Sequence, residues 1–182
     1  MLIDPNKFWA WAYGDFLSNA NRGVLAEYIV HKAIRSKTPQ RIEWESYDLI
    51  GQEDLKVEVK CSAYLQSWKQ DSPSKLVFDI ALKTAWHADT NTFDKDPSRP
   101  ADVYVFCIFK SKDPQTANPL NTDEWEFTVV PTKELNTKYP LQKTISYSTL
   151  VRNGYEPVAF ENLAHAISNC QQNSLANQEI SS

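Results

Sequence analysis

The stretch that decides the fold runs from Tyr47 to Trp68 and reads YDLIGQEDLKVEVKCSAYLQSW. Apolar and polar residues alternate over its central part, residues 55–62, which is the period of a strand with one buried face. The apolar face carries Leu55, Val57, Val59 and Cys61. The polar face carries Lys56, Glu58, Lys60 and Ser62. We therefore expect Glu58 and Lys60 side by side on one exposed face.

A turn and an earlier strand are predicted directly before this strand. Residues 51–54 (GQED) have the composition of a turn, and residues 42–49 are rich in β-branched and aromatic types. Together these segments predict a β-hairpin. Asp48, near the end of the first strand, is then expected beside Glu58. Two carboxylates at that distance repel each other unless a cation lies between them.

The residue types at this hairpin indicate a metal-assisted hydrolysis. Oxygen ligands favour Mg²⁺, with Mn²⁺ as a possible substitute, over zinc, and Mg²⁺ takes one or two protein carboxylates plus water and phosphate oxygens. We expect Asp48 and Glu58 to bind the metal. The ammonium of Lys60 can orient the attacking water and neutralise charge that develops on a phosphate. The predicted reaction is hydrolysis of a phosphodiester bond.

Asp48, followed after a turn by Glu58-Val59-Lys60, resembles the metal-binding motif of the PD-(D/E)XK nucleases, the restriction-endonuclease-like superfamily. The resemblance implies an α/β fold whose core is a helix, a three-strand β-meander, a helix and a further strand, with a central mixed sheet flanked by helices. It implies a Mg²⁺-dependent DNA endonuclease of the restriction, repair or mobile-element type. Tyr47 stands where the motif has proline, and Asp54 and Glu53 are the alternative acids.

A helix is predicted before the hairpin, from Asn21 onward. Its apolar stripe consists of Leu25, Ala26, Ile29, Val30 and Ala33. Glu27 borders this stripe and is the only acid of the segment NRGVLAEYIVHKAIRSK. In the nucleases that the chain resembles, this helix often carries a glutamate that reaches toward the metal, so Glu27 is a further catalytic candidate. A glutamate that is paired with a lysine or solvated is the alternative. Ser62 and Gln66 closely follow Lys60 and are candidates for contacting substrate.

The rest of the chain supplies further strands and helices around this hairpin. Residues 75–83 are predicted to form the third strand of the meander, and residues 84–100 a long polar loop in which Arg99 is a candidate phosphate contact. Residues 103–109 are apolar throughout, which predicts a strand buried on both faces. Residues 125–130 predict another strand, and an amphipathic helix is expected around residues 160–167.

Length and composition limit the class of protein. With 182 residues, the chain is expected to form one domain over residues 1–170, followed by a disordered tail over 171–182. The formal net charge of −4 argues against a protein that coats nucleic acid through charge alone. Because no apolar run is long enough to span a bilayer and the N-terminus lacks a signal pattern, we expect no membrane contact and a cytoplasmic location. The three cysteines fit reduced thiols.

An aromatic segment at the N-terminus supports a second hypothesis. Asp4-Pro5 is a typical helix start, and Phe8, Trp9 and Trp11 follow at helical spacing. We expect these aromatic side chains to pack in the core or to form a dimer contact. The alternative to a nuclease is therefore a catalytically inactive nuclease-fold module for binding or assembly, for example through a homodimer. A nuclease that acts on RNA is a third hypothesis, which the 2′-hydroxyl of the substrate would decide.

Overall fold

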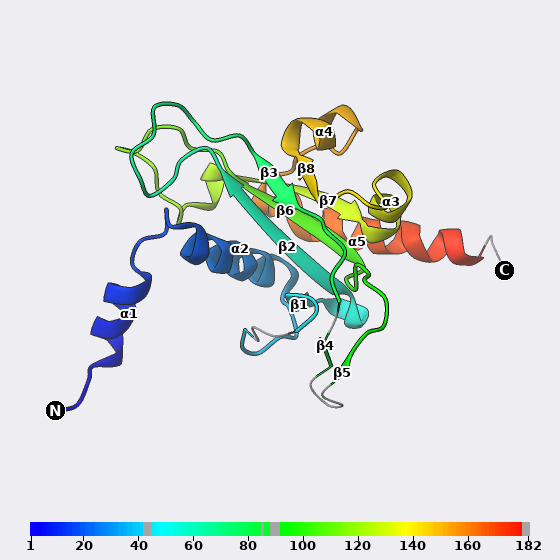
Figure 1. Cartoon of the computed structure of the whole chain (residues 1–182), viewed down its shortest axis with the longest axis horizontal. Helices are drawn as coiled ribbons and strands as arrows, with labels where there is room; N and C mark the ends of the chain where they lie inside the picture. The colour runs from blue at the N-terminus through cyan, green and yellow to red at the C-terminus, as the bar shows by residue number, and fades with distance from the viewer. Residues whose placement is uncertain (42–44, 85, 88–91, 180–182) are drawn as a thin grey trace.

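The structure is a computed structural model that describes residues 1–41, 45–84, 86–87 and 92–179, and of residues 171–179 the course of the helix only. Figure 1 shows the arrangement of its helices and strands. The helices are α1 (Pro5–Tyr13), α2 (Asn19–Ile34), α3 (Thr132–Lys138), α4 (Tyr147–Arg152) and α5 (Phe160–Glu179). The strands are β1 (Leu49–Ile50), β2 (Lys56–Ala63), β3 (Val77–Asp79), β4 (Trp86–His87), β5 (Thr92–Phe93), β6 (Val103–Phe109), β7 (Trp125–Pro131) and β8 (Thr144–Ser146). Single 3₁₀ turns cover Gln52–Asp54 and Thr122–Glu124.

A four-stranded mixed sheet in the order β1-β2-β6-β7 forms the centre of the molecule. β1 and β2 are antiparallel, with Leu49 opposite Val57, and form the predicted hairpin. β2 and β6 are parallel, with Glu58 opposite Tyr104, and β7 runs antiparallel to β6. The mixed α/β class is thus confirmed. The first strand of the hairpin is shorter than predicted, because residues 45–48 are not in strand conformation and 42–44 lie outside the described residues.

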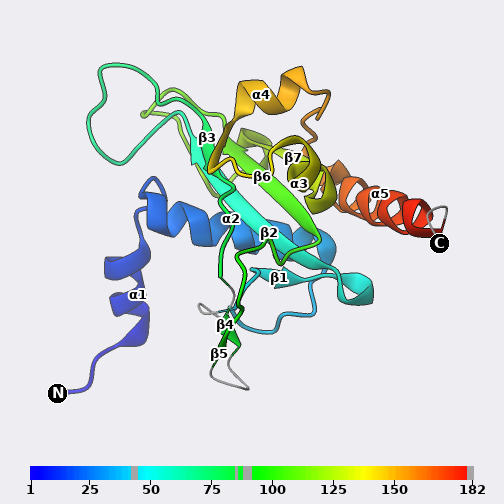
Figure 2. The same cartoon turned by 45° about the vertical axis from the view of Figure 1, so that its right-hand side comes forward.

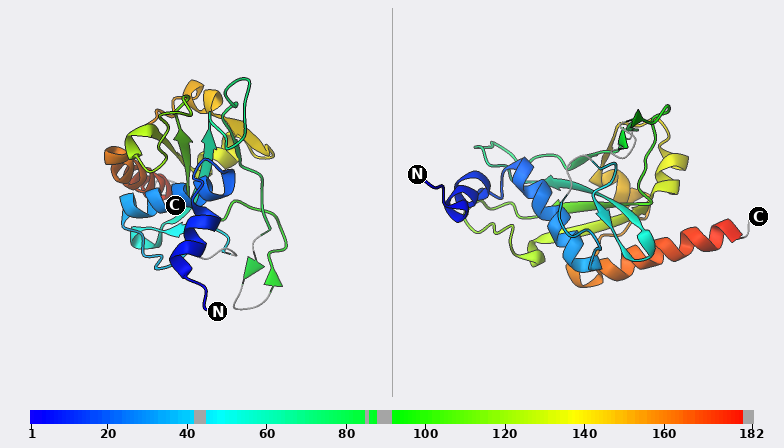
Figure 3. Two further views of the ribbon diagram at one scale, coloured as in Figure 1. Left: turned by 90° about the vertical axis from the view of Figure 1, so that its left-hand side faces the viewer. Right: turned by 90° about the horizontal axis from the view of Figure 1, so that it is seen from below.

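β6 is buried at every residue, as its continuous apolar sequence predicts. On one face of the sheet, α2 and α5 pack against it through side chains that include Val30 and Leu163. On the other face, β3, β8, α3 and α4 cover it through side chains that include Phe78 and Leu150. Figures 2 and 3 show these layers from three further directions. Two apolar cores therefore enclose the sheet. None of the described helices has the length and hydropathy needed to cross a membrane.

The third strand of the predicted meander is a correction. Residues 77–79 do form a strand, but β3 pairs with β8, with Phe78 opposite Ile145, and not with the four-stranded sheet. The ring centroids of Phe78 and Phe106 are 4.9 Å apart, so β3 lies over the face of the sheet and buries its apolar residues there. Within the described part of the chain between β2 and β6 there is also no helix. Both features depart from the core order that the resemblance implies.

The two ends of the chain differ from what their patterns suggest. α1 begins as predicted, with the Asp4 side chain accepting a hydrogen bond from the backbone N–H of Asn6 (2.9 Å). None of its residues is buried, however, and Trp11 is 85% exposed, so its aromatic residues do not pack in the core. The helix projects from the body of the molecule (Figure 1). At the other end, α5 continues to Glu179, where the composition predicts a disordered tail.

Candidate active site

The hairpin holds Asp48 against the second strand through two hydrogen bonds. Its backbone N–H donates to the carbonyl of Val57 (3.0 Å), and its Oδ2 accepts from the backbone N–H of Val59 (2.7 Å). These contacts place its carboxyl group across the hairpin, next to the position of Glu58 in β2. The alternative acids lie in the turn: Glu53 and Asp54 have positive φ angles, and Asp54 pairs with Lys37 (3.0 Å). Asp48 is therefore the acid that the fold brings to Glu58.

Glu58 is buried between two lysines. Its side chain is 4% exposed, and Oε1 lies 2.6 Å from Nζ of Lys60 and 2.6 Å from Nζ of Lys83. The Lys60 side chain is only 17% exposed. The expectation of a solvated strand face is therefore wrong. The physical reason is that β6 lies beside β2 and the β3 segment covers this face, as the contact with Lys83 shows.

The electrostatics of the site follow from this burial. Burial raises the pKa of Asp48 to about 6, and the nearby Glu58 carboxylate adds to the shift, while the hydrogen bond from Val59 opposes it. For Lys83, burial alone lowers the pKa, but the charge of Glu58 outweighs it and the net pKa is raised. Burial, and then Glu58, raises the pKa of Tyr104 to about 12. Tyr104 thus stays protonated at neutral pH, beside a charged cluster.

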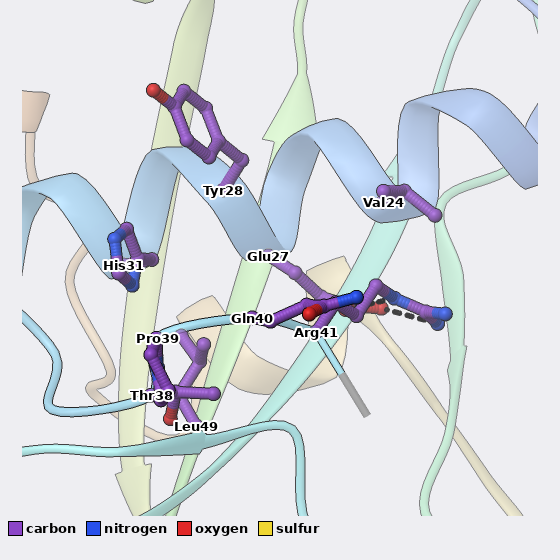
Figure 4. Close-up of a pocket in the computed structure, with 9 residues that line it drawn as sticks. All are labelled: Val24, Glu27, Tyr28, His31, Thr38, Pro39, Gln40, Arg41 and Leu49. Atoms are coloured by element: carbon purple, nitrogen blue, oxygen red, sulfur yellow. Dashed lines mark hydrogen bonds and ion pairs between the residues drawn. The ribbon is translucent and has the colours of Figure 1, made fainter. Parts of the chain in front are cut away.

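Glu27 lies near this cluster but has its own partner. Its carboxylate binds Arg41 through two contacts, Nε to Oε2 at 2.6 Å and Nη2 to Oε1 at 3.2 Å. It also contributes to the raised pKa of Asp48, so its charge is felt at the site. Figure 4 shows Glu27 and Arg41 at a pocket of about 150 Å³, which Tyr28 and Pro39 help to line. The alternative for Glu27, a contact with lysine or solvent, is thus replaced by a contact with arginine, and its catalytic role stays a prediction.

Of the two candidate substrate contacts, Gln66 is engaged within the fold. Its Oε1 accepts a hydrogen bond from Nη2 of Arg22 (3.2 Å), and its Nε2 donates to the carbonyl of Ala63 (3.2 Å). Arg22 is itself only 1% exposed, so this contact ties α2 to the end of β2. Ser62 is half-buried on β2, opposite Ile108 of β6. Ser62 stays a candidate, whereas Gln66 has a structural partner that sequence patterns do not indicate.

The predicted phosphate contact of Arg99 is wrong. Its side chain is buried and 5% of the residue is exposed. Its guanidinium donates to the carbonyl of Ile80 (2.8 Å), to Oδ1 of Asn136 (2.7 Å) and to the carbonyl of Tyr139 (2.9 Å). The donors that would bind a phosphate in a bidentate way are therefore used within the protein. Arg99 connects segments of the fold and does not face a substrate.

The site offers a small set of oxygen ligands. Oδ2 of Asp48 and Oε1 of Glu58 are engaged by the protein, whereas no described residue donates a hydrogen bond to Oδ1 of Asp48 or Oε2 of Glu58. No three histidine, cysteine or acidic side chains cluster as a metal site within the described ranges. Two carboxylates fit Mg²⁺, which fills its shell with water, but not a structural zinc site with four protein ligands.

Two functional candidates at this site have no signal of their own in the sequence. Lys83 ends a stretch with strand periodicity, and Arg41 lies in the connection between α2 and β1, so neither stands out before the chain is folded. Comparison with known proteins adds no assignment: no family model matches the chain, and no curated protein matches its sequence. The function must therefore be argued from the geometry of the cluster.

Proposed function

We propose that the chain is a metal-dependent phosphodiesterase that cuts DNA, with Mg²⁺ or Mn²⁺ bound by Asp48 and Glu58. The observation that supports this proposal is the convergence of two carboxylates and a lysine on one hairpin. Glu58 contacts Lys60 at 2.6 Å, and the hydrogen bond from Val59 to Asp48 holds the second carboxylate beside them. The raised pKa of Asp48 reflects burial and repulsion by Glu58, which a bound cation would relieve.

The residues of the cluster have distinct roles in this proposal. Oδ1 of Asp48 and Oε2 of Glu58 would hold the ion, whose chemistry is to polarise a phosphate oxygen and to acidify a water molecule. Lys60, in contact with Glu58, orients the attacking water and neutralises charge on the phosphate in the transition state. Glu27 adds negative charge near Asp48, and its contact with Arg41 holds the Glu27 carboxylate in place.

DNA as substrate follows from the resemblance of the Asp48 and Glu58-Val59-Lys60 pattern to restriction-endonuclease-like enzymes, with restriction, repair and mobile-element roles equally open. RNA is the alternative substrate. The thiols of Cys61 and Cys107 belong to the core region, which fits the reducing cytoplasm that we propose as the compartment.

A cleavage assay tests the proposal. Purified protein is incubated with circular, linear, single-stranded and branched DNA, and with RNA, in Mg²⁺, Mn²⁺ or EDTA. We expect metal-dependent cutting by the wild type and a loss of about 100-fold or more in Lys60→Ala, since a positioned proton-transfer or charge-stabilising group contributes that much. Lys56→Ala is the matched control, because Lys56 is an exposed lysine of the same strand.

The outcome for Lys60→Ala decides the assignment. Thermal melting of the variant should resemble that of the wild type, because Glu58 keeps its contact with Lys83. A folded Lys60→Ala protein that cuts as fast as the wild type would contradict the catalytic role of Lys60. Loss of cutting in Lys56→Ala to the same degree would show that general loss of charge, and not Lys60, is responsible.

One observation favours a second candidate function, an inactive nuclease-fold module for binding or assembly. α1 exposes Trp9, Trp11 and Tyr13 and buries none of its residues. A helix of nine residues is marginal in water by itself, so an aromatic surface on it fits docking to a partner, such as a second copy in a homodimer. Titration with Mg²⁺ separates the two functions, because a binding module should show no metal-dependent rise in melting temperature, and Asp48→Asn should abolish any such rise.

A further inference from the structure

Lys83 places a second ammonium group against the carboxylate of Glu58, which Lys60 already contacts. Its Nζ contacts the same oxygen of Glu58 as Nζ of Lys60, each at 2.6 Å, so the two nitrogens lie no more than about 5 Å apart. A buried carboxylate carries one negative charge, which Lys60 alone neutralises. The second ammonium adds repulsion between like charges at this oxygen. The Asp48 carboxylate near Glu58 balances that charge in the metal-free protein, but in the proposed function it binds a divalent cation, so the two carboxylates then face two ammoniums and the metal and the cluster has a net positive charge.

This excess charge lies on the side of the cluster that solvent can reach. The side chain of Lys83 is 42% exposed, whereas those of Lys60 and Glu58 are 17% and 4% exposed. A lysine with that much exposure does not need a buried partner, because water solvates its ammonium well. An arrangement of two ammoniums at one carboxylate is best satisfied by a further anion, and a phosphate oxygen matches the point charge of an ammonium.

The backbone at Lys83 is fixed, so the position of its ammonium is set by the fold. Lys83 and Ser98 exchange two backbone hydrogen bonds, of 2.8 and 2.9 Å. Arg99, which directly follows Ser98, is buried and donates to the carbonyl of Ile80 (2.8 Å) and to Asn136 (2.7 Å). Arg99 thus anchors the segment that ends at Lys83. It acts as a positioning residue, in place of the phosphate contact that its chemistry suggests.

We infer that Lys60 and Lys83 form a two-ammonium site that binds an oxygen of a nucleic acid phosphate next to Glu58, with Lys83 as a substrate-binding residue. This inference rests on the proposed function, because it names the group that holds the substrate at the same cluster. The competing explanation is structural: Lys83 would only tie the β3 segment to β2 through Glu58.

Binding of DNA under conditions that prevent cleavage tests the inference. Every protein carries Asp48→Asn, EDTA is present, and the affinity for a fluorescein-labelled duplex is measured by anisotropy between about 50 and 200 mM KCl. Removing one phosphate contact should weaken binding and lower the slope of log affinity against log salt by about 1. We expect this change for Lys83→Ala. Lys75→Ala is the matched control, since Lys75 is an exposed lysine of the same segment, and should leave the slope unchanged.

The conservative variant separates binding from a structural role. Lys83→Arg keeps the positive charge and should retain the salt slope of the Asp48→Asn parent. An unchanged slope in Lys83→Ala, or an equal loss in Lys83→Arg, would overturn the inference, as would the absence of DNA binding in the parent. If the slope falls as expected while no wild-type cleavage is found, the phosphate site stands and the proposed nuclease function fails. In a cleaving enzyme, Lys83→Ala should raise KM more than it lowers kcat.

Discussion

At the scale of single residues, Asp48 is a buried acid that the fold holds close to a second carboxylate. Its carboxyl group is tied to the N–H of Val59 at 2.7 Å and lies near the buried Glu58. Burial and this neighbour raise the pKa of Asp48 to about 6, above its ordinary value of 3.8. The folded protein therefore binds a proton at Asp48 more tightly than the unfolded chain. Between about pH 4 and pH 6, this residue makes the free energy of unfolding fall as pH rises.

Asp48→Asn removes this charge but keeps an oxygen that can accept the hydrogen bond from Val59. In metal-free protein we expect it to raise the free energy of unfolding at pH 7 by about 1–2 kcal/mol and to flatten the dependence between pH 4 and pH 6. Urea titrations at several pH values in EDTA measure both. The control is Asp54→Asn, which makes the same change at a side chain that is 85% exposed. Equal or lower stability of Asp48→Asn at pH 7 would contradict the prediction.

At the scale of elements, the two terminal helices have opposite relations to the core. α5 buries Leu163 and Ile167 against the sheet, whereas α1 buries none of its residues. Helical periodicity of apolar residues predicts a helix in both cases, but it does not say whether a partner surface is present. In α5 the partner is the sheet, and in α1 the described part of the chain provides none of comparable size.

This difference predicts the effect of removing α1. Deleting residues 1–13 should shift the melting temperature by no more than about 2 °C, because little apolar surface leaves a buried environment. Differential scanning fluorimetry measures the shift. Leu163→Ala in α5 is the contrasting variant and should cost about 2–5 kcal/mol, because it opens a cavity in the core. A large loss of stability on deleting α1 would show that the helix packs on the body of the protein in solution, or on a second copy.

At the scale of the whole molecule, Arg99 connects the β3 segment to the region around α3. Its four acceptors are the carbonyl of Ile80, just after β3, and oxygens of Asn136, Tyr139 and Gln142, in and after α3. A buried guanidinium with several hydrogen bonds stabilises such a junction only while its acceptors stay in place. The same junction positions Lys83, so the packing of the second core and the geometry of the candidate site are linked.

Arg99→Met, which removes the donors and keeps much of the volume, should destabilise the protein by about 2–4 kcal/mol, because four acceptors lose a charged partner. Chemical denaturation measures the change. Arg152→Met is the control: Arg152 is exposed in α4, so its loss should cost less than about 0.5 kcal/mol. If both variants unfold at the same urea concentration, Arg99 does not have the connecting role that its contacts indicate.

The elements that the sequence predicted well are those whose pattern is local. The strand at 56–63 and the helix that carries Glu27 follow from periods of two and 3.6 residues, whereas the first strand of the hairpin, predicted over 42–49, is observed only at 49–50. Burial of all seven residues of β6 follows from its unbroken apolar run. The pairing of Asp48 with Glu58 was predictable for the same reason, because a short turn brings their segments together whatever surrounds them.

The sequence by itself thus determined which residues form strands and helices, and that an acid, a glutamate and a lysine meet at one hairpin. Only the tertiary structure decided that β3 covers the sheet, that Arg99 is buried, and that Lys83 reaches Glu58. The physical reason is that periodicity records which face of a segment is apolar, but not which distant surface will cover that face. Partners separated by 25 residues or more along the chain, such as Glu58 and Lys83, are chosen when the layers pack.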